Sequence, residues 1–345
     1  HSGNVSTFSN GFTLTSASLQ RQRKNQNDDP TGIEQWLQIQ NAKLQEDSPL
    51  RAIPASNQAP TLGAQPGAAP SSPLAIWTSG SISMGDSGDA SDSDQAFLTS
   101  GLSAGADYRW TPKLTVGLGF GYGRDKTDIG DNGSRSQADS YSLALYSSYR
   151  PIESIYLDAV LGYQRLSFDT RRYITDNANT VNGDRDGDLT FASLALGYEY
   201  RQEHWMLSPY ARLDLTHGTL DSYEERGDAI FALRYEEQTV KTTSTSLGLR
   251  GEYAQTTAIG ELTPSLRLEY QHDFQGDGDA AMRYVNGDTL YRSTLEALGQ
   301  DRGVFGLGLG LLTEANWSLR MEYQYTLSSG SQQAQSMLFS LRKPF

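Results

Sequence analysis

The sequence lacks cysteine, long apolar runs and any excess of basic residues. Without cysteine, the 345-residue chain can form neither a disulfide nor a thiolate metal site. No stretch holds the roughly 18 consecutive apolar residues that a transmembrane helix needs. The 28 Lys and Arg residues stand against 41 Asp and Glu residues, which gives a net charge of −13. Such an acidic balance argues against a nucleic-acid partner, which would require a basic surface.

The first 73 residues are predicted to lie outside the main fold. Residues 1–45 are polar, and beyond Pro30 apolar side chains recur at helical spacing in a narrow stripe (Ile33, Trp36, Leu37 and Leu44). Residues 46–73 are rich in Pro, Ala, Ser and Gln, a composition typical of a linker. We expect a helical linker or plug over 1–45, a linker over 46–73 and a separate domain over 74–345. The first residues lack the basic start and apolar run of a signal peptide, so we interpret the chain as a mature product or a piece of a longer one.

From Leu74 onward, apolar residues alternate with small or polar ones. In the run 317–327 every second residue is apolar, and the residues between are Ser, Arg, Glu, Gln and Thr. A period of two is typical of a strand with one apolar and one polar face. About twelve such segments follow one another, an even number as in bacterial single-chain barrels. The sequence therefore predicts an all-β fold, a transmembrane antiparallel up-and-down β-barrel with an N-terminal helical segment that is a candidate for the pore.

Two features favour a barrel in lipid over a soluble β-sandwich. The apolar faces begin or end in aromatic residues, as in the girdles at membrane interfaces: Tyr108, Trp110, Tyr149, Tyr163, Trp205, Tyr253 and Trp317. The opposite faces carry opposite charges two residues apart, which places both charges on one face of a strand. These predicted lumen charge pairs are Asp107 and Arg109, Glu199 and Arg201, Arg212 and Asp214, Arg250 and Glu252, Arg267 and Glu269, and Arg320 and Glu322.

Short and long connections alternate along the domain. The segments 111–113, 151–153, 202–204 and 314–316 are predicted tight turns. The segments 85–95, 170–187, 220–238 and 275–300 are predicted long loops, rich in Asp, Gly and Asn. Short periplasmic turns and long outer loops are typical of outer-membrane barrels, so the connections support the same fold.

The last residues, 333–345, read as a strand with one apolar face. That face carries Met337, Phe339, Leu341 and the terminal Phe345, while Ser336, Ser340 and Arg342 fall on the other side. The strand is expected to pair with the first one, near Ile76, because closure removes both edges of the sheet. We interpret the four apolar residues as an assembly signal.

Several runs of this chain together resemble the β-domain of classical (type V) bacterial autotransporters. They are IWTSG (76–80), GLSAGADYRW (101–110), LTVGLGFGY (114–122), DSYSLALY (139–146), YLDAVLGY (156–163), LEYQH (268–272) and the terminal Phe345. The resemblance covers 74–345 and implies a twelve-stranded outer-membrane barrel at the end of a larger secreted polypeptide, with a helix crossing the pore. Lys343 and Pro344 depart from the family pattern, which has an apolar residue two positions before the terminal aromatic.

The resemblance also implies a function, a location and partners. The barrel is expected to anchor the chain in the outer membrane, with its C-terminus in the periplasm, and to let an upstream passenger reach the cell surface. Expected partners are outer-membrane lipid and lipopolysaccharide, periplasmic chaperones, the barrel-assembly machinery and the passenger. We expect a monomer with no cofactor and no nucleic-acid partner. Because the linker is long for this family, the pore could hold the helix or residues 15–24, and the helix could instead lie in the periplasm.

Candidate chemistry is sparse. Some autotransporters cut themselves through an Asn of the pore helix, and Asn41 lies in the candidate helix, where Asp158 or Glu269 could face it. The paired-Asn pattern of that subgroup is absent, so we expect no cleavage. Residues 182–188 imitate the start of a calcium loop, but Ser193 at its twelfth position cannot supply the bidentate carboxylate.

Two further patterns are weak. Arg-Gly-Asp at 226–228 lies in a long loop, and a three-residue match occurs often by chance. Asp214 and His217 could belong to a hydrolase at the rim, but residues three apart point to opposite faces of a regular strand. Nucleotide-binding loops and zinc-type histidine pairs are missing. The sequence thus predicts a translocator that is not an enzyme, with a porin-like channel as the first alternative and an outer-membrane hydrolase as the second.

Overall fold

The computed structural model describes residues 73–87, 95–129, 133–174, 177–274, 278–286, 291–295, 301–328 and 332–344. The predicted N-terminal helix, the linker up to residue 72 and Phe345 lie outside this part of the chain. Among the described residues, no helix is long and apolar enough to cross a membrane.

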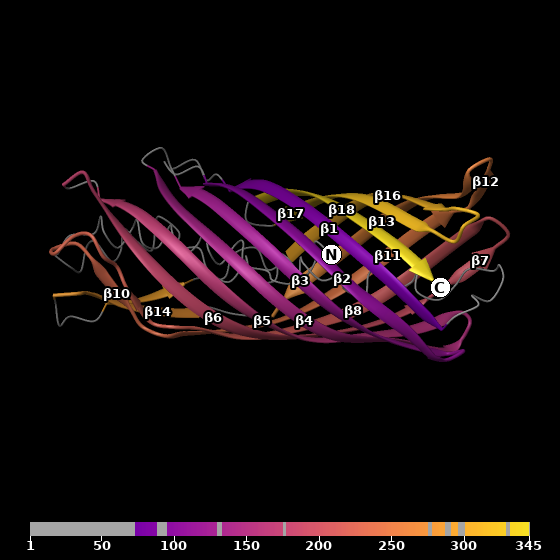
Figure 1. Ribbon diagram of the computed structural model, residues 1–345, viewed down its shortest axis with the longest axis horizontal. Helices are drawn as coiled ribbons and strands as arrows, with labels where there is room; N and C mark the ends of the chain where they lie inside the picture. The colour runs from indigo at the N-terminus through magenta and orange to yellow at the C-terminus, as the bar shows by residue number, and fades with distance from the viewer. Residues whose placement is uncertain are drawn as a thin grey trace.

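Twelve long strands form one closed antiparallel sheet (Figure 1). They are β1 (Leu74–Ser87), β2 (Gln95–Thr111), β3 (Leu114–Ile129), β4 (Ser134–Ile152), β5 (Ile155–Ile174), β6 (Asn179–Tyr198), β8 (Trp205–Leu220), β11 (Gln238–Tyr253), β13 (Gly260–Asp273), β16 (Asp301–Leu312), β17 (Ser318–Ser328) and β18 (Gln332–Pro344). Each pairs with its neighbour in this order, and β18 pairs with β1 from Ala75↔Pro344 to Ser87↔Gln332. Short strands β7 (Tyr200–Gln202) and β12 (Gln255–Thr257) lengthen the wall beside β8 and β13. The predicted twelve-stranded up-and-down barrel is confirmed.

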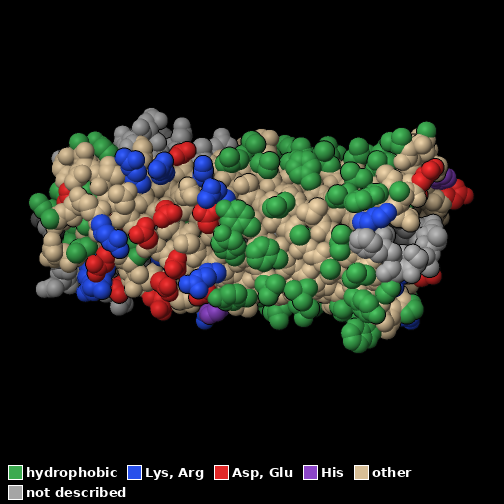
Figure 2. Space-filling model, viewed as in Figure 1, with side chains coloured by type: hydrophobic (Ala, Val, Ile, Leu, Met, Phe, Trp, Pro, Cys, Tyr) green, Lys and Arg blue, Asp and Glu red, His purple; other side chains and the backbone are tan. Residues whose placement is uncertain are grey.

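The alternation in sequence separates an apolar outside from a polar inside. On β4, Leu143 and Leu145 are more than half exposed on the outer wall, whereas Ser140 and Ser142 point inward and are buried. Figure 2 shows hydrophobic side chains over the middle and right of the outer surface. On β4 this belt runs from Tyr149 to Tyr141, and eight residues of a strand tilted by about 40° span roughly 20 Å. That height is close to the apolar band of about 25 Å in outer-membrane barrels.

The two ends of the barrel differ. At the short-turn end, on the right in Figure 1, β3 follows β2 after only Pro112 and Lys113, and the described chain both begins and ends there. At the opposite, long-loop end, the strands β4, β5 and β6 continue well beyond the hydrophobic belt. Figure 2 shows Lys, Arg, Asp and Glu side chains on this projecting wall.

The predicted loop over residues 170–187 is wrong. β5 continues to Ile174 and β6 begins at Asn179, so most of this segment is a paired extension of two strands. The outward positions Asp184, Asp186 and Asp188 alternate with inward positions, and this gives the stretch its loop-like composition. On a strand, these three carboxylates point outward side by side and do not converge on one point as the ligands of a calcium loop do. Residues 182–188, which imitate the start of a calcium loop in sequence, therefore form an ordinary strand.

A second, small sheet lies at the long-loop end. It contains β9 (Tyr223–Glu224), β10 (Leu233–Tyr235), β14 (Gly278–Tyr284) and β15 (Tyr291–Leu295), within two of the predicted long loops. Leu233, Tyr235 and Met282 are at most 1 % exposed and pack in one cluster with Phe168 and Leu189 from the inward faces of β5 and β6. This cap sheet therefore folds onto the inside of the projecting wall.

A buried ion pair fixes the cap sheet to the wall. Arg172 of β5 binds Glu225 at 2.5 and 3.0 Å, and both side chains are almost fully buried. Glu225 also accepts hydrogen bonds from the Leu233 backbone N–H at 3.0 Å and the Tyr235 hydroxyl at 3.1 Å. Since a buried charge is tolerated only when it is paired and hydrogen-bonded, these contacts hold the cap sheet in one position.

The Arg-Gly-Asp stretch has a structural role in the loop between β9 and β10, where it contacts the start of β6. The backbone N–H groups of Phe231 and Ile230 and the amide of Asn179 donate to Asp228, and the Phe231 N–H is the main cause that holds the Asp228 pKa well below its usual range. Because this pKa is lowered on folding, its contribution to loop stability is present at neutral pH and is lost only in strong acid.

Candidate functional site: the barrel interior

The predicted interfacial aromatics all lie on the outer wall. Six of them border the belt near the short-turn end: Tyr108, Trp110, Tyr149, Trp205, Tyr253 and Trp317. Trp205 and Tyr253 have ring centroids 4.8 Å apart. Lys343 lies over the Trp317 ring at 5.2 Å, which gives this unusual residue of the closing strand a partner at the membrane border.

Tyr163 belongs to the other border of the belt, together with tyrosines that the sequence reasoning missed. Tyr122 donates to Asp139 at 2.6 Å, Tyr270 donates to Asp301 at 2.5 Å, and Tyr163 donates to Asp188. Each of these tyrosines has Arg or His two residues later on the same face. An outward Tyr followed two residues later by a basic residue is a sequence signal for the border of the belt on the long-loop side.

The predicted charge pairs point into the barrel, but only three of the six are in contact within their own strand. The contacting pairs are Glu199 with Arg201 at 2.8 Å, Arg212 with Asp214 at 2.7 Å, and Arg250 with Glu252 at 3.4 Å. The other carboxylates take partners from the next strand but one: Asp107 pairs with Arg342, Glu269 with Arg212 and Glu322 with Arg267. These pairs therefore bridge the strand between them along the inner wall.

Arg212 is the centre of the largest of these clusters. Its Nε donates to Asp214 at 2.7 Å, and one terminal nitrogen donates to Glu269 at 2.9 Å and to Ser246 at 3.0 Å. The Tyr210 hydroxyl donates to the same Glu269 at 2.5 Å. The Arg212 side chain is 0 % exposed. In such surroundings each charge depends on the others, because an unpaired ion would carry a desolvation cost of several kcal/mol.

Two further clusters continue the charged interior toward the short-turn end. Arg320 donates to Glu252 at 3.2 Å, beside Arg250. Glu199, fully buried in its side chain, lies between Arg150 at 3.1 Å and Arg201 at 2.8 Å. Each cluster places two arginines around one glutamate, so both keep the interior polar and each carries one excess positive charge.

A separate group lies at the seam where β18 meets β1. Asp107 accepts from Arg342 at 3.1 Å and from the Tyr146 hydroxyl, and Trp77 donates its indole N–H to Tyr146 at 2.5 Å. The group joins β1, β2, β4 and β18 through side chains alone. It thus reinforces the junction between the first and last strands.

Aromatic rings from neighbouring strands pack directly over several inward glycines. A Cβ on Gly117 would overlap the Tyr146 ring, one on Gly197 the Tyr156 ring, and one on Gly248 the Tyr210 ring. The rings lie flat against the wall because glycine leaves room for them. From the sequence, small inward residues such as Gly117 are expected to leave room for a helix in the pore. In the structure, the Tyr146 ring occupies the space over Gly117.

The residues considered for catalysis are not brought together. Asp214 is buried inside the barrel, whereas His217 is exposed on the outer wall. Asp158 faces the interior opposite Ser148, Glu269 is engaged by Arg212 and Tyr210, and Asn41 lies outside the described residues. The described residues contain no His, Asp and Glu group arranged to hold a metal ion.

The closed barrel, its aromatic borders and its charged interior can be compared with known proteins. Residues 76–324 match the model of the family described as "Autotransporter beta-domain". The chain belongs to this autotransporter family. As an autotransporter β-domain, it is an outer-membrane anchor and translocator, and the family implies a linked passenger domain.

The curated relatives match this chain over a minor part of their own length. Esterase EstA from Pseudomonas aeruginosa is 27 % identical over 251 residues, which cover 70 % of this chain and 38 % of EstA. An extracellular serine protease from Serratia marcescens is 27 % identical over 259 residues, which cover 72 % of this chain and 24 % of the protease. The chain thus spans well under half the length of either protein.

The fold agrees with a solved autotransporter. The translocator domain of autotransporter NalP from Neisseria meningitidis superposes with a TM-score of 0.64, covering 79 % of this chain and 88 % of that one. The two sequences are 17 % identical, so the likeness extends to the fold alone.

Proposed function

We propose that this autotransporter β-domain lets an upstream passenger cross the outer membrane through its polar interior and then holds it at the cell surface. The observation that carries the proposal is a closed wall with a charged interior, built around Arg212 and Glu269, inside an apolar belt. A polar lumen solvates a peptide backbone, which an apolar one would not. The described ends of β1 and β18 both lie at the short-turn end, and this supports a periplasmic position for that end and an outer position for the long-loop end.

The N-terminal segment has a role in the same proposal. Residues 1–45 are a tether and plug, 46–73 a linker and 74–345 the barrel. An α-helix is about 10 Å across, a width that a twelve-stranded barrel can hold. The lumen charge pairs would keep the pore wet around this segment.

The outward residues Met337, Phe339 and Leu341 of β18, with Phe345, form the proposed assembly signal. On the described part of the strand, Phe339 is 39 % exposed on the outer wall, and Ser336 is buried inside, where it meets Ser83 at 2.7 Å. An apolar face presented along the last strand suits recognition by the barrel-assembly machinery and periplasmic chaperones.

Pore conductance separates this function from a porin-like channel. In planar bilayers, the full chain should conduct weakly, and deletion of 1–73 should raise the conductance several-fold, because the plug is gone while the barrel remains. Gating traces of both forms at equal protein amounts provide the measurement. A large conductance in the full chain that is unchanged by the deletion would make the protein a channel.

The relatives' enzyme names offer a second test of the proposal. EstA and the Serratia protease carry different activities in their names yet share this domain, which fits a common translocator joined to different passengers. Hydrolysis of lipid or peptide substrates by the 345-residue chain, lost in His217→Ala, would contradict a purely translocating role.

A further inference from the structure

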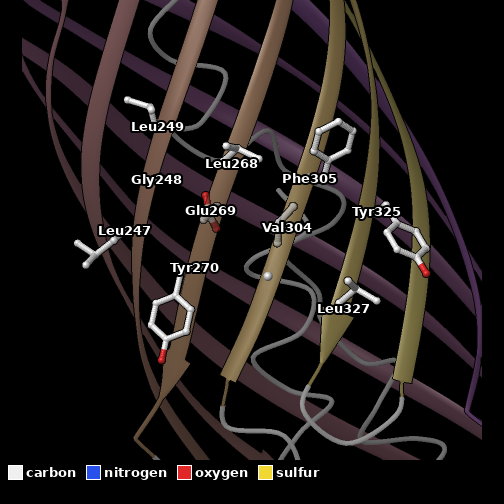
Figure 3. Close-up of a pocket in the computed structure, with 11 residues that line it drawn as sticks. Leu247, Gly248, Leu249, Leu268, Glu269, Tyr270, Val304, Phe305, Tyr325 and Leu327 are labelled. Atoms are coloured by element: carbon white, nitrogen blue, oxygen red, sulfur yellow. The ribbon is translucent and has the colours of Figure 1, made fainter.

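A groove crosses the outer wall of β11, β13, β16 and β17. Its volume is about 550 Å³, within the range of roughly 300–1,000 Å³ that ligand sites occupy. Figure 3 shows Leu249, Leu268 and Phe305 projecting from one side of the wall, with Glu269 and Val304 behind them. Val304 and Glu269 are buried inside the barrel, whereas the projecting side chains are 40 to 48 % exposed. The groove therefore opens toward the membrane.

A missing side chain creates the floor of the groove. Gly303 lies directly between Tyr270 on β13 and Leu327 on β17, each its Cα partner in the sheet. Two strand spacings separate these flanking residues by about 10 Å. A Cβ on Gly303 would meet nothing within 4 Å, so neither packing nor a neighbouring strand requires glycine there. Gly303 thus differs from the inward glycines Gly117, Gly197 and Gly248, each of which accommodates a ring.

Polar groups lie just beyond one end of the groove. On the long-loop side of Gly303, the Asp301 carboxylate accepts from the hydroxyl of the lining residue Tyr270 at 2.5 Å and meets His272 Nδ1 at 2.8 Å. On the other flank, the hydroxyl of Tyr325 donates to Gln333 at 2.8 Å. On the short-turn side of Gly303 the lining residues are Phe305, Leu268 and Leu249. The groove is therefore apolar along its length, and polar groups border the end that meets the membrane surface.

We propose that this groove binds one acyl chain of an outer-leaflet glycolipid, the lipopolysaccharide class, whose sugar headgroup lies against Asp301 and His272. Such a lipid has an apolar tail that matches the apolar lining of the groove and a hydroxyl-rich head that matches the polar groups around Asp301. The tail lies inside the membrane and the head at its surface, as the lining and the polar groups do. The choice of glycolipid over phospholipid rests on the proposed function, which places the long-loop end outside. The acyl chain fills the space over Gly303, and a larger side chain at position 303 would exclude the acyl chain from that space.

The test compares Gly303→Leu with Ala159→Leu in the full chain, extracted from outer membranes in mild detergent. Ala159 also lies on the outer wall, on β5, so the control adds the same side chain away from the groove. Native mass spectrometry counts the lipids that remain bound. Gly303→Leu is expected to lower retained glycolipid roughly tenfold, the equivalent of about two buried methylene groups, and Ala159→Leu to leave it unchanged. Heat-dependent migration on gels verifies that each barrel is folded, and Gly303→Ala, with a smaller loss, replaces Gly303→Leu if the latter fails to assemble.

Three results would overturn the inference, and they separate it from the proposed function. Equal retention in all variants means that the groove binds no lipid and leaves translocation untouched. Phospholipid lost specifically from Gly303→Leu means that the groove faces the inner leaflet, so the proposed orientation fails as well. A dimer in the parent chain that Gly303→Leu dissociates makes the groove a contact between two copies.

Discussion

Replacing Arg212 by alanine is expected to lower the free energy of unfolding by about 3–5 kcal/mol, because Asp214 and Glu269 would remain buried without their cation. Both carboxylates lie within 2.9 Å of Arg212 nitrogens, and all three side chains are at most 2 % exposed. The urea midpoint and slope of the folded barrel in lipid vesicles give the change in free energy.

Arg124→Ala is the matched control for that prediction. Arg124 also contacts a carboxylate, Asp139 at 2.8 Å, but its side chain is 46 % exposed on the outer wall. A solvent-exposed pair contributes little to stability, so this variant should unfold close to the parent midpoint. Equal losses in the two variants would show that the Arg212 cluster is solvated and does not hold the interior together.

Deleting 332–344 together with Phe345 is expected to abolish the folded barrel. β18 makes a continuous ladder with β1 on one side and β17 on the other, and Arg342 joins Asp107 across the seam. Without it, both β1 and β17 would expose unpaired edges, which are unacceptable in a lipid environment. Loss of heat-dependent gel migration and of protease resistance in outer-membrane fractions would show the failure.

Deletion of 1–73 is the control for the loss of β18. It removes a longer segment but leaves all twelve barrel strands, so its product should still show the migration of a folded barrel. A folded barrel in both deletions would mean that closure by β18 is not what stabilises the sheet. Failure of both would mean that the N-terminal segment is needed for folding itself.

The barrel could be predicted from the sequence because its physical cause is local. Alternation in runs such as 317–327 determines which face of each strand meets lipid, and the even number of segments determines how the sheet closes. The outward aromatics Trp110 and Trp205 and the inward charge of Glu199 and Arg201 follow from the same period of two.

Side-chain contacts between strands that are not paired with each other could not be predicted in the same way. Arg267 lies two residues from Glu269 yet pairs with Glu322, because the barrel curvature and strand stagger decide which inward side chains meet. The cap sheet was missed since β9 and β10 are two and three residues long, too short for any period to appear. The groove over Gly303 depends on a vacancy between Tyr270 and Leu327, and only the register reveals it.

The most direct measurement is the cellular position of a tag placed just before His1, in a chain exported to the periplasm by a signal peptide. The translocator account predicts that external protease and antibody reach the tag on intact cells, and that the tag becomes inaccessible from outside when 332–345 are deleted. A tag that stays protected in intact cells carrying a folded barrel, and becomes accessible only after the outer membrane is opened, would contradict translocation through this domain.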